Sequence, residues 1–528
     1  MKVYLVDGRF FKMWNYLLVI AVALGSDAAR ILGFFPTPSI SHQVAFKPLT
    51  HELARRGHEV VVVTTDPVYP KGQTPPNLTE IDVHDISYET WRKHFLSTTT
   101  GKTDDTYNQI STIIHLFRII FEQQVLNDEV KDLIRNKNGT FDLLLLEQCV
   151  RPAWSLSHVF KTPTILVSSF GEVYDVLGAA GGPNHPLIYP TVLRQKLYQL
   201  TLWEKISELY SHYYFEKIFD EAAMKDNELT KRLFGPDTPT LTELLKNMEM
   251  VFLNVHPIWE GNRPVPPNVV FMGGIHQKPE KPLPQELKTY LDSSKNGVIY
   301  ISFGTNVMPS MLPPERIQIL VKVFSKLPYD VLWKYDKDEL PGRSKNIRLE
   351  KWLPQSDLLR HPKVKMFITQ GGLQSTDEAI TAGVPLIGVP MLGDQWYNVD
   401  HYVHHKIGLR LDMETLTEET FMDAVKTILN DDSYRKNIIR LREIMHDQPQ
   451  KPLERAVWWA EHVIRHKGAK HLKSSAANLT WAEYYEIELI SILLVALLSI
   501  VLVISSIIYF IWKYVSKNFI TTVKFKKL

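Results

Sequence analysis

Short apolar runs alternate with helical patterns along most of the chain. Residues 30–35 and 59–65 are predicted strands, and residues 42–56 between them repeat apolar side chains at helical spacing. Further apolar runs at 143–146 and 164–168 are also predicted strands. Strand–helix–strand units of this kind build parallel sheets covered by helices. The first half of the chain is therefore expected to fold around one doubly wound sheet.

A second alternating series follows a stretch rich in proline and charge. Residues 273–284 carry three prolines and no hydrophobic periodicity, which is typical of a linker. The fold class that the pattern predicts is α/β, with two Rossmann-like domains in tandem and a ligand at the carboxyl ends of their strands. The expected domains are 26–275, a linker at 276–287, and 288–470 with returning helices. Within the second, we expect strands at 297–303, 329–334, 366–369 and 386–389, and helices at 314–326 and up to Ala382.

The C-terminal region contains a segment that is apolar enough to cross a bilayer. Residues 489–512 hold 24 positions without a charge, and a helix of that length measures about 36 Å. The tail at 513–528 carries five lysines and no acidic residue. By the positive-inside rule, this tail is expected to be cytoplasmic.

The N-terminal region looks like a secretory signal. Basic residues precede an apolar stretch that is too short to span a membrane and is followed by small residues, so 1–25 is predicted to be a cleaved signal peptide. Together with the C-terminal segment, this predicts a type I membrane protein with a luminal body. Sequons at Asn77, Asn138 and Asn478 fit that side. The terminal KFKKL resembles dilysine retrieval signals, which points to the endoplasmic reticulum.

Composition excludes several classes of protein. Lys and Arg (60) nearly balance Asp and Glu (58), and 45% of residues are hydrophobic, so the chain is expected to be folded. A single cysteine excludes a disulfide framework, and the absence of a strong basic excess argues against nucleic acid as a partner. The near-neutral total averages a mildly acidic body with a basic tail.

Two glycine-containing loops follow predicted strands in the second half. Gln370-Gly371-Gly372 leads from a strand into a helix, and Phe303-Gly304-Thr305-Asn306 follows the first strand of this half. Free N–H groups and the dipole at a helix N-terminus bind phosphate, and glycine lets the backbone approach it closely. One such loop alone is often only a tight turn, but two of them are suited to a diphosphate. Upstream, Trp352 and Gln355 offer an aromatic plate and an amide that suit a nucleobase.

These residues carry a resemblance to a known family. The block FITQGGLQSTDEAITAGVPLIGVPMLGDQWYN resembles the signature of the UDP-glycosyltransferase family, most closely its insect membrane members. The likeness extends to SHQ and RGHEVVVVT near the N-terminus, to VIYISFGT and KWLPQ, and to the C-terminal anchor. It implies the GT-B architecture, with the acceptor bound mainly by the N-terminal domain and UDP-sugar by the C-terminal one.

The resemblance also implies roles for individual residues. Trp352 would stack on uracil, Gln355 would contact the nucleoside, and Glu378 would accept hydrogen bonds from ribose. Asp394 and Gln395 would hold sugar hydroxyls. The residues expected near the phosphates are Ser302, Gly304, Thr305, Gln370, Gly371, Gly372 and Gln374.

Two departures from the family pattern concern the phosphate loop. Many relatives have His where Gln370 stands and Asn-Gly where Gln374-Ser375 stand. An amide can donate to phosphate but carries no positive charge. Stabilisation of the leaving group is therefore expected to depend more on backbone N–H groups and the helix dipole.

The expected catalytic base is His42, at the start of the first predicted helix. The positive end of a helix dipole favours the neutral imidazole, which is the form able to take a proton from an acceptor hydroxyl. The family places a carboxylate partner, typically Asp, where this chain has Glu147. Such a partner would fix the imidazole tautomer and stabilise the imidazolium. Cys149, two residues further on, is expected to be inert packing.

Other chemistry-bearing residues have plainer interpretations. Asp336-Lys337-Asp338 matches a metal-binding pattern but is expected to form a solvated turn, and His401, His404 and His405 are expected on a surface or core face. No metal or other cofactor is expected. The aromatic segment 198–219 is expected to form a helix whose apolar face lies in the core, or else a wall for a lipophilic substrate.

The function implied by the resemblance is inverting transfer of a hexose from a UDP-sugar to hydroxyl groups of small lipophilic acceptors. Glucose is favoured and glucuronic acid is possible. The alternative is a catalytically silent, membrane-anchored binding protein of the same fold. The sequence does not indicate the oligomeric state.

Overall fold

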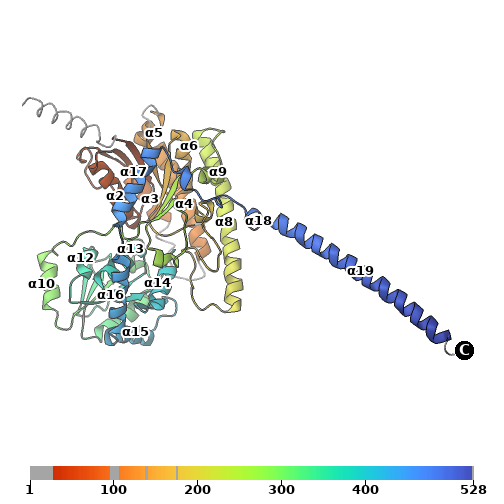
Figure 1. Ribbon diagram of the computed structural model, residues 1–528. Helices are drawn as coiled ribbons and strands as arrows, with labels where there is room; N and C mark the ends of the chain where they lie inside the picture. Colours follow the sequence, from red (N-terminus) through yellow and green to blue (C-terminus); the bar gives the residue numbers. More distant parts are fainter. Residues whose placement is uncertain (1–27, 95–105, 137–140, 174–175, 526–528) are drawn as a thin grey trace, which may run out of the picture.

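The structure is a computed structural model that describes residues 28–94, 106–136, 141–173 and 176–525 (Figure 1). The predicted signal peptide and the sequon at Asn138 lie outside these residues.

The first sheet contains seven parallel strands within the described residues, in the order β3-β2-β1-β4-β5-β6-β7. The strands predicted at 30–35 and 164–168 have the predicted bounds. These strands are easy to predict because both of their faces are covered, so that they form nearly continuous apolar runs. The strands are β1 Arg30–Phe35, β2 Glu59–Thr64, β3 Leu78–Asp82, β4 Leu143–Glu147, β5 Thr164–Ser168, β6 Met250–Leu253 and β7 Val269–Phe271.

The second sheet has six parallel strands in the described part of the chain, in the order β10-β9-β8-β11-β12-β13. Strand order reverses between β8 and β11, as it does between β1 and β4 in the first sheet. Such switch points open crevices at the carboxyl ends of the strands. The strands are β8 Val298–Ser302, β9 Asp330–Lys334, β10 Ile347–Glu350, β11 Val364–Thr369, β12 Leu386–Gly388 and β13 Gly408–Arg410.

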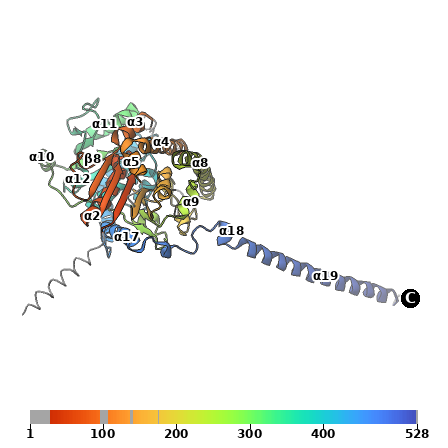
Figure 2. The ribbon, with the colours of Figure 1, turned by 90° about the horizontal axis from the view of Figure 1, so that it is seen from above.

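Helices cover both sheets (Figures 1 and 2). Those that precede the second sheet are α2 Ile40–Arg55, α3 His84–His94, α4 Thr106–Leu126, α5 Asp128–Arg135, α6 Leu156–Phe160, α7 Val176–Ala179, α8 Leu202–Phe234, α9 Leu241–Lys246 and α10 Gln285–Ser293. Those that follow are α11 Pro314–Ser325, α12 Gln355–Leu359, α13 Leu373–Ala382, α14 Gln395–His404, α15 Glu418–Asn430, α16 Ser433–His446, α17 Pro452–His466, α18 Trp481–Tyr484 and α19 Ile487–Phe525. Short 3-10 helices lie at Arg151–Ser155, Pro257–Glu260, Pro309–Met311 and Lys470–Leu472.

Helix α17 returns to the first sheet and packs beside α2 (Figure 1). Its buried residues Ala456, Val457 and Ala460 belong to the same apolar cluster as Ile31 and Leu143 of the first sheet. The chain therefore crosses between the two sheets twice, which holds the crevice between them from two sides.

The aromatic segment is only partly in the core. Helix α8 begins at Leu202, after a capping box formed by Thr201 and Glu204. Large apolar side chains of its first half are exposed, Trp203 by 78% and Tyr210 by 66%. The expectation of a buried apolar face is therefore wrong for this half, and only the second half, from Phe219, contributes fully buried side chains.

Helix α19 contains the predicted apolar segment and extends away from the rest of the molecule (Figure 1). Among the described residues, it is the one helix that is long and apolar enough to cross a membrane.

Candidate functional site

A cavity of about 490 Å³ lies between the carboxyl ends of the two sheets. Every predicted site residue except Glu147 and Gly371 lines it. From the first half of the chain comes His42, and from the second come Ser302, Gly304, Thr305, Trp352, Gln355, Gln370, Gly372, Gln374, Glu378, Asp394 and Gln395. The structure therefore brings together predicted site residues from both halves of the chain.

His42 and Glu147 form a directly bonded pair. His42 lies in the first turn of α2, and its Nδ1 is 2.8 Å from Oε1 of Glu147, the last residue of β4. The carboxylate is 1% exposed and also accepts hydrogen bonds from the Thr37 backbone N–H (3.0 Å) and the Cys149 thiol (3.4 Å). Because the carboxylate is an acceptor, Nδ1 carries the hydrogen, and Nε2 keeps the lone pair that can accept a proton.

His42, Glu147 and Cys149 also have ligand atoms within 4.8 Å of one another, as a metal site requires. However, burial and the adjacent Glu147 carboxylate raise the pKa of the Cys149 thiol well above its ordinary value. A protonated thiol is a poor metal ligand, and the carboxylate is already occupied by three donors. The chemistry of this group therefore fits a base and its carboxylate better than a metal site.

Two glycines of the loops have a left-handed backbone conformation and no room for a side chain. Gly304 has a φ of 75°, and a Cβ there would lie 2.1 Å from Nε2 of Gln370. Gly371 has a φ of 91°, and a Cβ there would lie 2.5 Å from the Val399 side chain. Its carbonyl accepts a hydrogen bond from Asn398 of α14 (2.9 Å). Gly371 therefore packs against α14. Because it faces that helix, it does not line the cavity.

Gln355 and Glu378 lie at one end of the cavity and hold each other. The Gln355 amide donates to the Glu378 carboxylate (2.8 Å), and the Tyr300 hydroxyl donates to the Gln355 carbonyl (3.0 Å). Burial raises the pKa of Glu378, while the Gln355 hydrogen bond lowers it. Trp352, beside them, is 61% exposed and presents an open ring face.

Asp394 and Gln395 begin helix α14. Burial raises the pKa of Asp394 to about 6, although a hydrogen bond from Asn398 and the nearby His42 act in the opposite direction. The Gln395 side-chain carbonyl accepts from the backbone N–H groups of Met391 and Leu392, both at 2.9 Å. These hydrogen bonds hold the loop that precedes α14 in place.

Gln374 lines the cavity and also contacts the first half of the chain. Its amide donates to the carbonyl of Ser169, which follows the first sheet's β5 (2.9 Å). A second contact between the two halves joins Asn306 to Ser39 (3.1 Å). Gln374 therefore links the two walls of the cavity.

Lys334, at the end of β9, is a cavity residue that sequence reasoning missed. Its ammonium donates to the Gly304 carbonyl (2.9 Å) and lies 4.5 Å from the centre of the Trp352 ring. Burial lowers the pKa of Lys334 to about 8. The position of a charged residue at the carboxyl end of a predicted strand was the signal available in the sequence.

His276 was missed as well, because it falls in the predicted linker. Its side chain lines the cavity and is buried, and this burial lowers its pKa to about 4. It is therefore a neutral imidazole at the wall of the site.

The other side of the cavity is apolar. Its side chains come mainly from α3, α4, α8 and the loop before α8, and they include Trp91, Ile110, Ile113, Phe117, Phe170, Val192, Leu193 and Phe219. The cavity thus has one end rich in hydrogen-bonding groups and one that suits a lipophilic molecule, with His42 on its wall.

The remaining motifs lie in other environments. The Asp336 carboxylate accepts hydrogen bonds from Ser310, and Asp338 pairs with Lys351 at an exposed bend. His401 is buried, and burial lowers its pKa to about 3, whereas His404 is exposed.

Comparisons with known proteins agree with this geometry. The family model described as "UDP-glucoronosyl and UDP-glucosyl transferase" matches residues 32–522. The ecdysteroid UDP-glucosyltransferase of Spodoptera littoralis nuclear polyhedrosis virus is 36% identical over 512 residues, covering 92% of this chain and 98% of that protein. Human UDP-glucuronosyltransferase 2B7 is 31% identical over 497 residues, covering 90% and 92%.

Solved structures share the fold. Glycosyltransferase VinC, solved in complex with DTDP, has a TM-score of 0.56 and 16% identity, covering 83% of this chain and all of its own. The spinosyn forosaminyltransferase SpnP has a TM-score of 0.55 and 18% identity, covering 83% and 99%. These likenesses confirm the expected GT-B fold. The chain belongs to the UDP-glycosyltransferase family, whose members named above transfer glucosyl or glucuronosyl groups.

Proposed function

We propose that this enzyme transfers a hexose, preferably glucose, from a UDP-sugar to a hydroxyl group of a small lipophilic acceptor, with inversion at the anomeric carbon. Glucuronic acid is the other donor sugar compatible with the family. The observation that carries the proposal is the His42–Glu147 pair on the wall of a cavity with apolar side chains on one side and both glycine loops on the other.

The chemical step follows from that arrangement. The acceptor hydroxyl gives its proton to Nε2 of His42, and its oxygen forms a bond to the anomeric carbon. The bond between that carbon and the UDP oxygen breaks, and UDP leaves toward the glycine loops. Glu147 holds the ring through Nδ1–H and stabilises the imidazolium that forms.

Lys334 supplies charge to the leaving group in this proposal. The diphosphate would lie by the loop containing Ser302, Gly304 and Thr305, whose Gly304 carbonyl Lys334 contacts. An ammonium there offsets the lack of charge at Gln370, and backbone N–H groups at Gly372 and the α13 dipole add to it. The UDP leaving group would then be stabilised by the Lys334 ammonium as well as by backbone N–H groups and the helix dipole.

The remaining donor contacts follow the expected roles. Trp352 would stack on uracil, and Gln355 and Glu378 would exchange part of their mutual hydrogen bonding for contacts with the nucleoside and the ribose. Asp394 and Gln395 would hold sugar hydroxyls. The chemistry of these residues calls for no metal or other cofactor.

We further propose a location for the enzyme. Residues 489–512 of α19 would anchor it in the endoplasmic reticulum membrane as a type I protein, with 513–528 cytoplasmic and both sheets luminal. The apolar side of the cavity is consistent with acceptors that partition into that membrane.

A donor-by-acceptor assay tests this proposal against a silent binding protein of the same fold. Membranes containing the full chain are incubated with UDP-glucose or UDP-glucuronic acid and simple phenols, in excess chelator. We expect a conjugate with UDP-glucose at undiminished rate in chelator. Binding of UDP without any conjugate would support the silent protein instead.

A further inference from the structure

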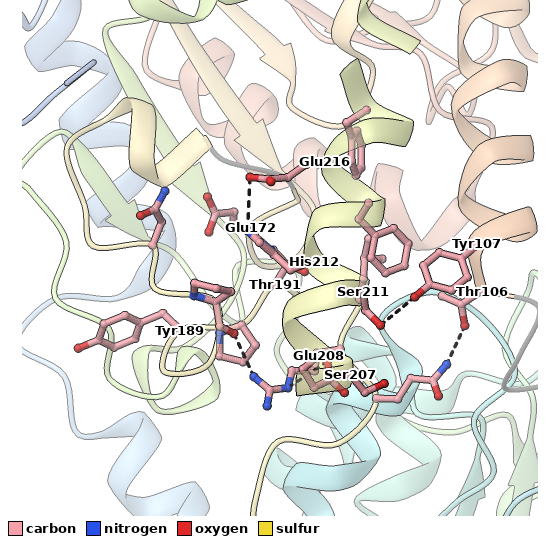
Figure 3. Close-up of a pocket in the computed structure, with 18 of the residues that line it drawn as sticks. Thr106, Tyr107, Glu172, Tyr189, Thr191, Ser207, Glu208, Ser211, His212 and Glu216 are labelled. Atoms are coloured by element: carbon pink, nitrogen blue, oxygen red, sulfur yellow. Dashed lines mark hydrogen bonds and ion pairs between the residues drawn. The ribbon is translucent and has the colours of Figure 1, made fainter. Parts of the chain in front are cut away.

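A second cavity of about 390 Å³ lies beside the first, between α8, the start of α4 and the loop at 184–195 (Figure 3). Ser207, Ser211 and His212 of α8 lie on one side of it, and Tyr107 and Thr106 of α4 close another (Figure 3). None of the residues assigned a role in catalysis or donor binding lines this cavity.

A thin apolar wall separates the two cavities. Leu193 and Phe219 line both of them. These two side chains form a small apolar cluster with Ile110 and Val192, apart from the three larger clusters of buried residues. A wall made of a few apolar side chains can yield by rotamer changes. A single layer of side chains therefore separates the second cavity from the apolar side of the first.

The polar groups of the second cavity are arranged as pairs. Arg194 lies 3.5 Å from Glu208, His212 lies 3.4 Å from Glu216, and Arg263 pairs with Glu172. Two donors are left over: Arg194 is 94% buried and Arg263 is 97% buried, and the Nη2 of each has no hydrogen-bond partner among the described residues. Mutually paired charges do not favour an ionic ligand, whereas a buried, unpartnered N–H favours one with a hydrogen-bond acceptor. A lipophilic molecule with one hydroxyl or carbonyl oxygen meets both conditions.

The second cavity borders the segment that leads into the proposed membrane anchor. Trp481 of α18 lines the cavity, and α19 begins at Ile487. Leu202, Trp203 and Tyr210 are exposed on α8, the helix that supplies one side of the cavity. Exposed aromatic side chains of this kind are characteristic of the membrane–water interface. They would place α8 and the cavity beside it where lipophilic molecules concentrate.

We propose that the second cavity is an antechamber through which lipophilic hydroxyl compounds pass from the membrane interface to His42. The unpartnered N–H groups of Arg194 and Arg263 receive the polar end of the compound. Leu193 and Phe219 separate the antechamber from the catalytic cavity. This inference rests on the proposed function, because the compound that passes through the cavity is the acceptor of that reaction. Water-soluble acceptors would reach His42 through the cleft between the two sheets.

Filling the antechamber tests the inference. Ser211→Trp places a large side chain inside it, and Lys205→Trp puts the same side chain at an exposed α8 position outside it. Each variant is assayed in phosphatidylcholine vesicles with UDP-glucose and either para-dodecylphenol, which partitions into the bilayer, or para-nitrophenol, which stays largely in water. We expect S211W to lower the ratio of kcat/KM for dodecylphenol to that for nitrophenol about tenfold, and K205W to keep the wild-type ratio. An unchanged ratio in a folded S211W would overturn the inference.

A binding measurement separates failure of this inference from failure of the proposed function. Wild-type protein in the same vesicles is photolabelled with a dodecylphenol that carries a diazirine in its chain. Labelling of α8 near Ser211, reduced by excess dodecylphenol, supports the antechamber even if no sugar is transferred. Labelling confined to α19 and the exposed residues of α8 would exclude it, whatever the activity.

Discussion

Replacing His42 with alanine is expected to lower kcat for sugar transfer by about a thousandfold, while UDP binds as it does to the wild type. The imidazole is the base that removes the acceptor proton, and it contributes nothing to the contacts proposed for the nucleotide. His42→Ala is measured for turnover of a phenol with saturating UDP-glucose, and UDP affinity is measured by calorimetry. His94→Ala, at an exposed position of α3, is the matched control and is expected to be fully active.

Glu147→Gln refines this result. The amide oxygen can still accept from Nδ1–H but carries no charge to stabilise the imidazolium, so we expect an intermediate loss of roughly a hundredfold in kcat. Turnover within a factor of about two of the wild type in both variants would remove His42 and Glu147 from the mechanism.

Replacing Lys334 with methionine is expected to lower kcat by about a hundredfold and to raise KM for UDP-glucose. The change removes the ammonium that lies next to Gly304 and over the Trp352 ring, and it keeps an unbranched side chain. Lys337→Met, three residues further along and exposed, is the control and should behave as the wild type. A K334M enzyme with normal kcat would show that backbone N–H groups and the α13 dipole are sufficient for the leaving group.

The same lysine makes activity depend on pH. Burial lowers the pKa of Lys334 in the free enzyme to about 8, so the ammonium is present below that pH and is lost above it. We therefore expect kcat/KM for UDP-glucose to fall as pH rises through about 8, with kcat falling only at higher pH because the bound diphosphate raises the pKa. Lys334→Arg, which stays charged, should abolish this fall. An identical profile in K334R would assign it to another group.

Much of the fold could be predicted because the central strands are buried on both faces. β1 and β5 consist mainly of buried apolar residues, and their bounds match the prediction. β3, Leu78–Asp82, was missed because it lies at the edge of the sheet, where only Leu78 and Ile81 are buried, and because it includes acidic side chains. The exposed half of α8 was misinterpreted because aromatic residues at helical spacing look the same in a sequence whether they face the core or solvent.

The candidate site was predictable where a side chain acts next to its own loop and not where its position depends on distant packing. His42 and Asp394 lie at helix starts, and both line the cavity. Gln374 contacts Ser169 across the two halves, and no local pattern encodes that distance. Lys334 lies far in the sequence from both Gln370 and His42, and only the pairing of β9 with β8 brings it to the phosphate loop.

The most direct test of the proposed reaction is the anomeric configuration of the product. The full chain in vesicles is given UDP-glucose, in which the sugar is α-linked, together with para-nitrophenol, and the conjugate is examined by proton NMR. Attack opposite the departing UDP by an oxygen activated by His42 gives the β-glucoside, formed by the wild type and lost in His42→Ala. An α-glucoside, or free glucose released without any conjugate, would contradict the proposed mechanism.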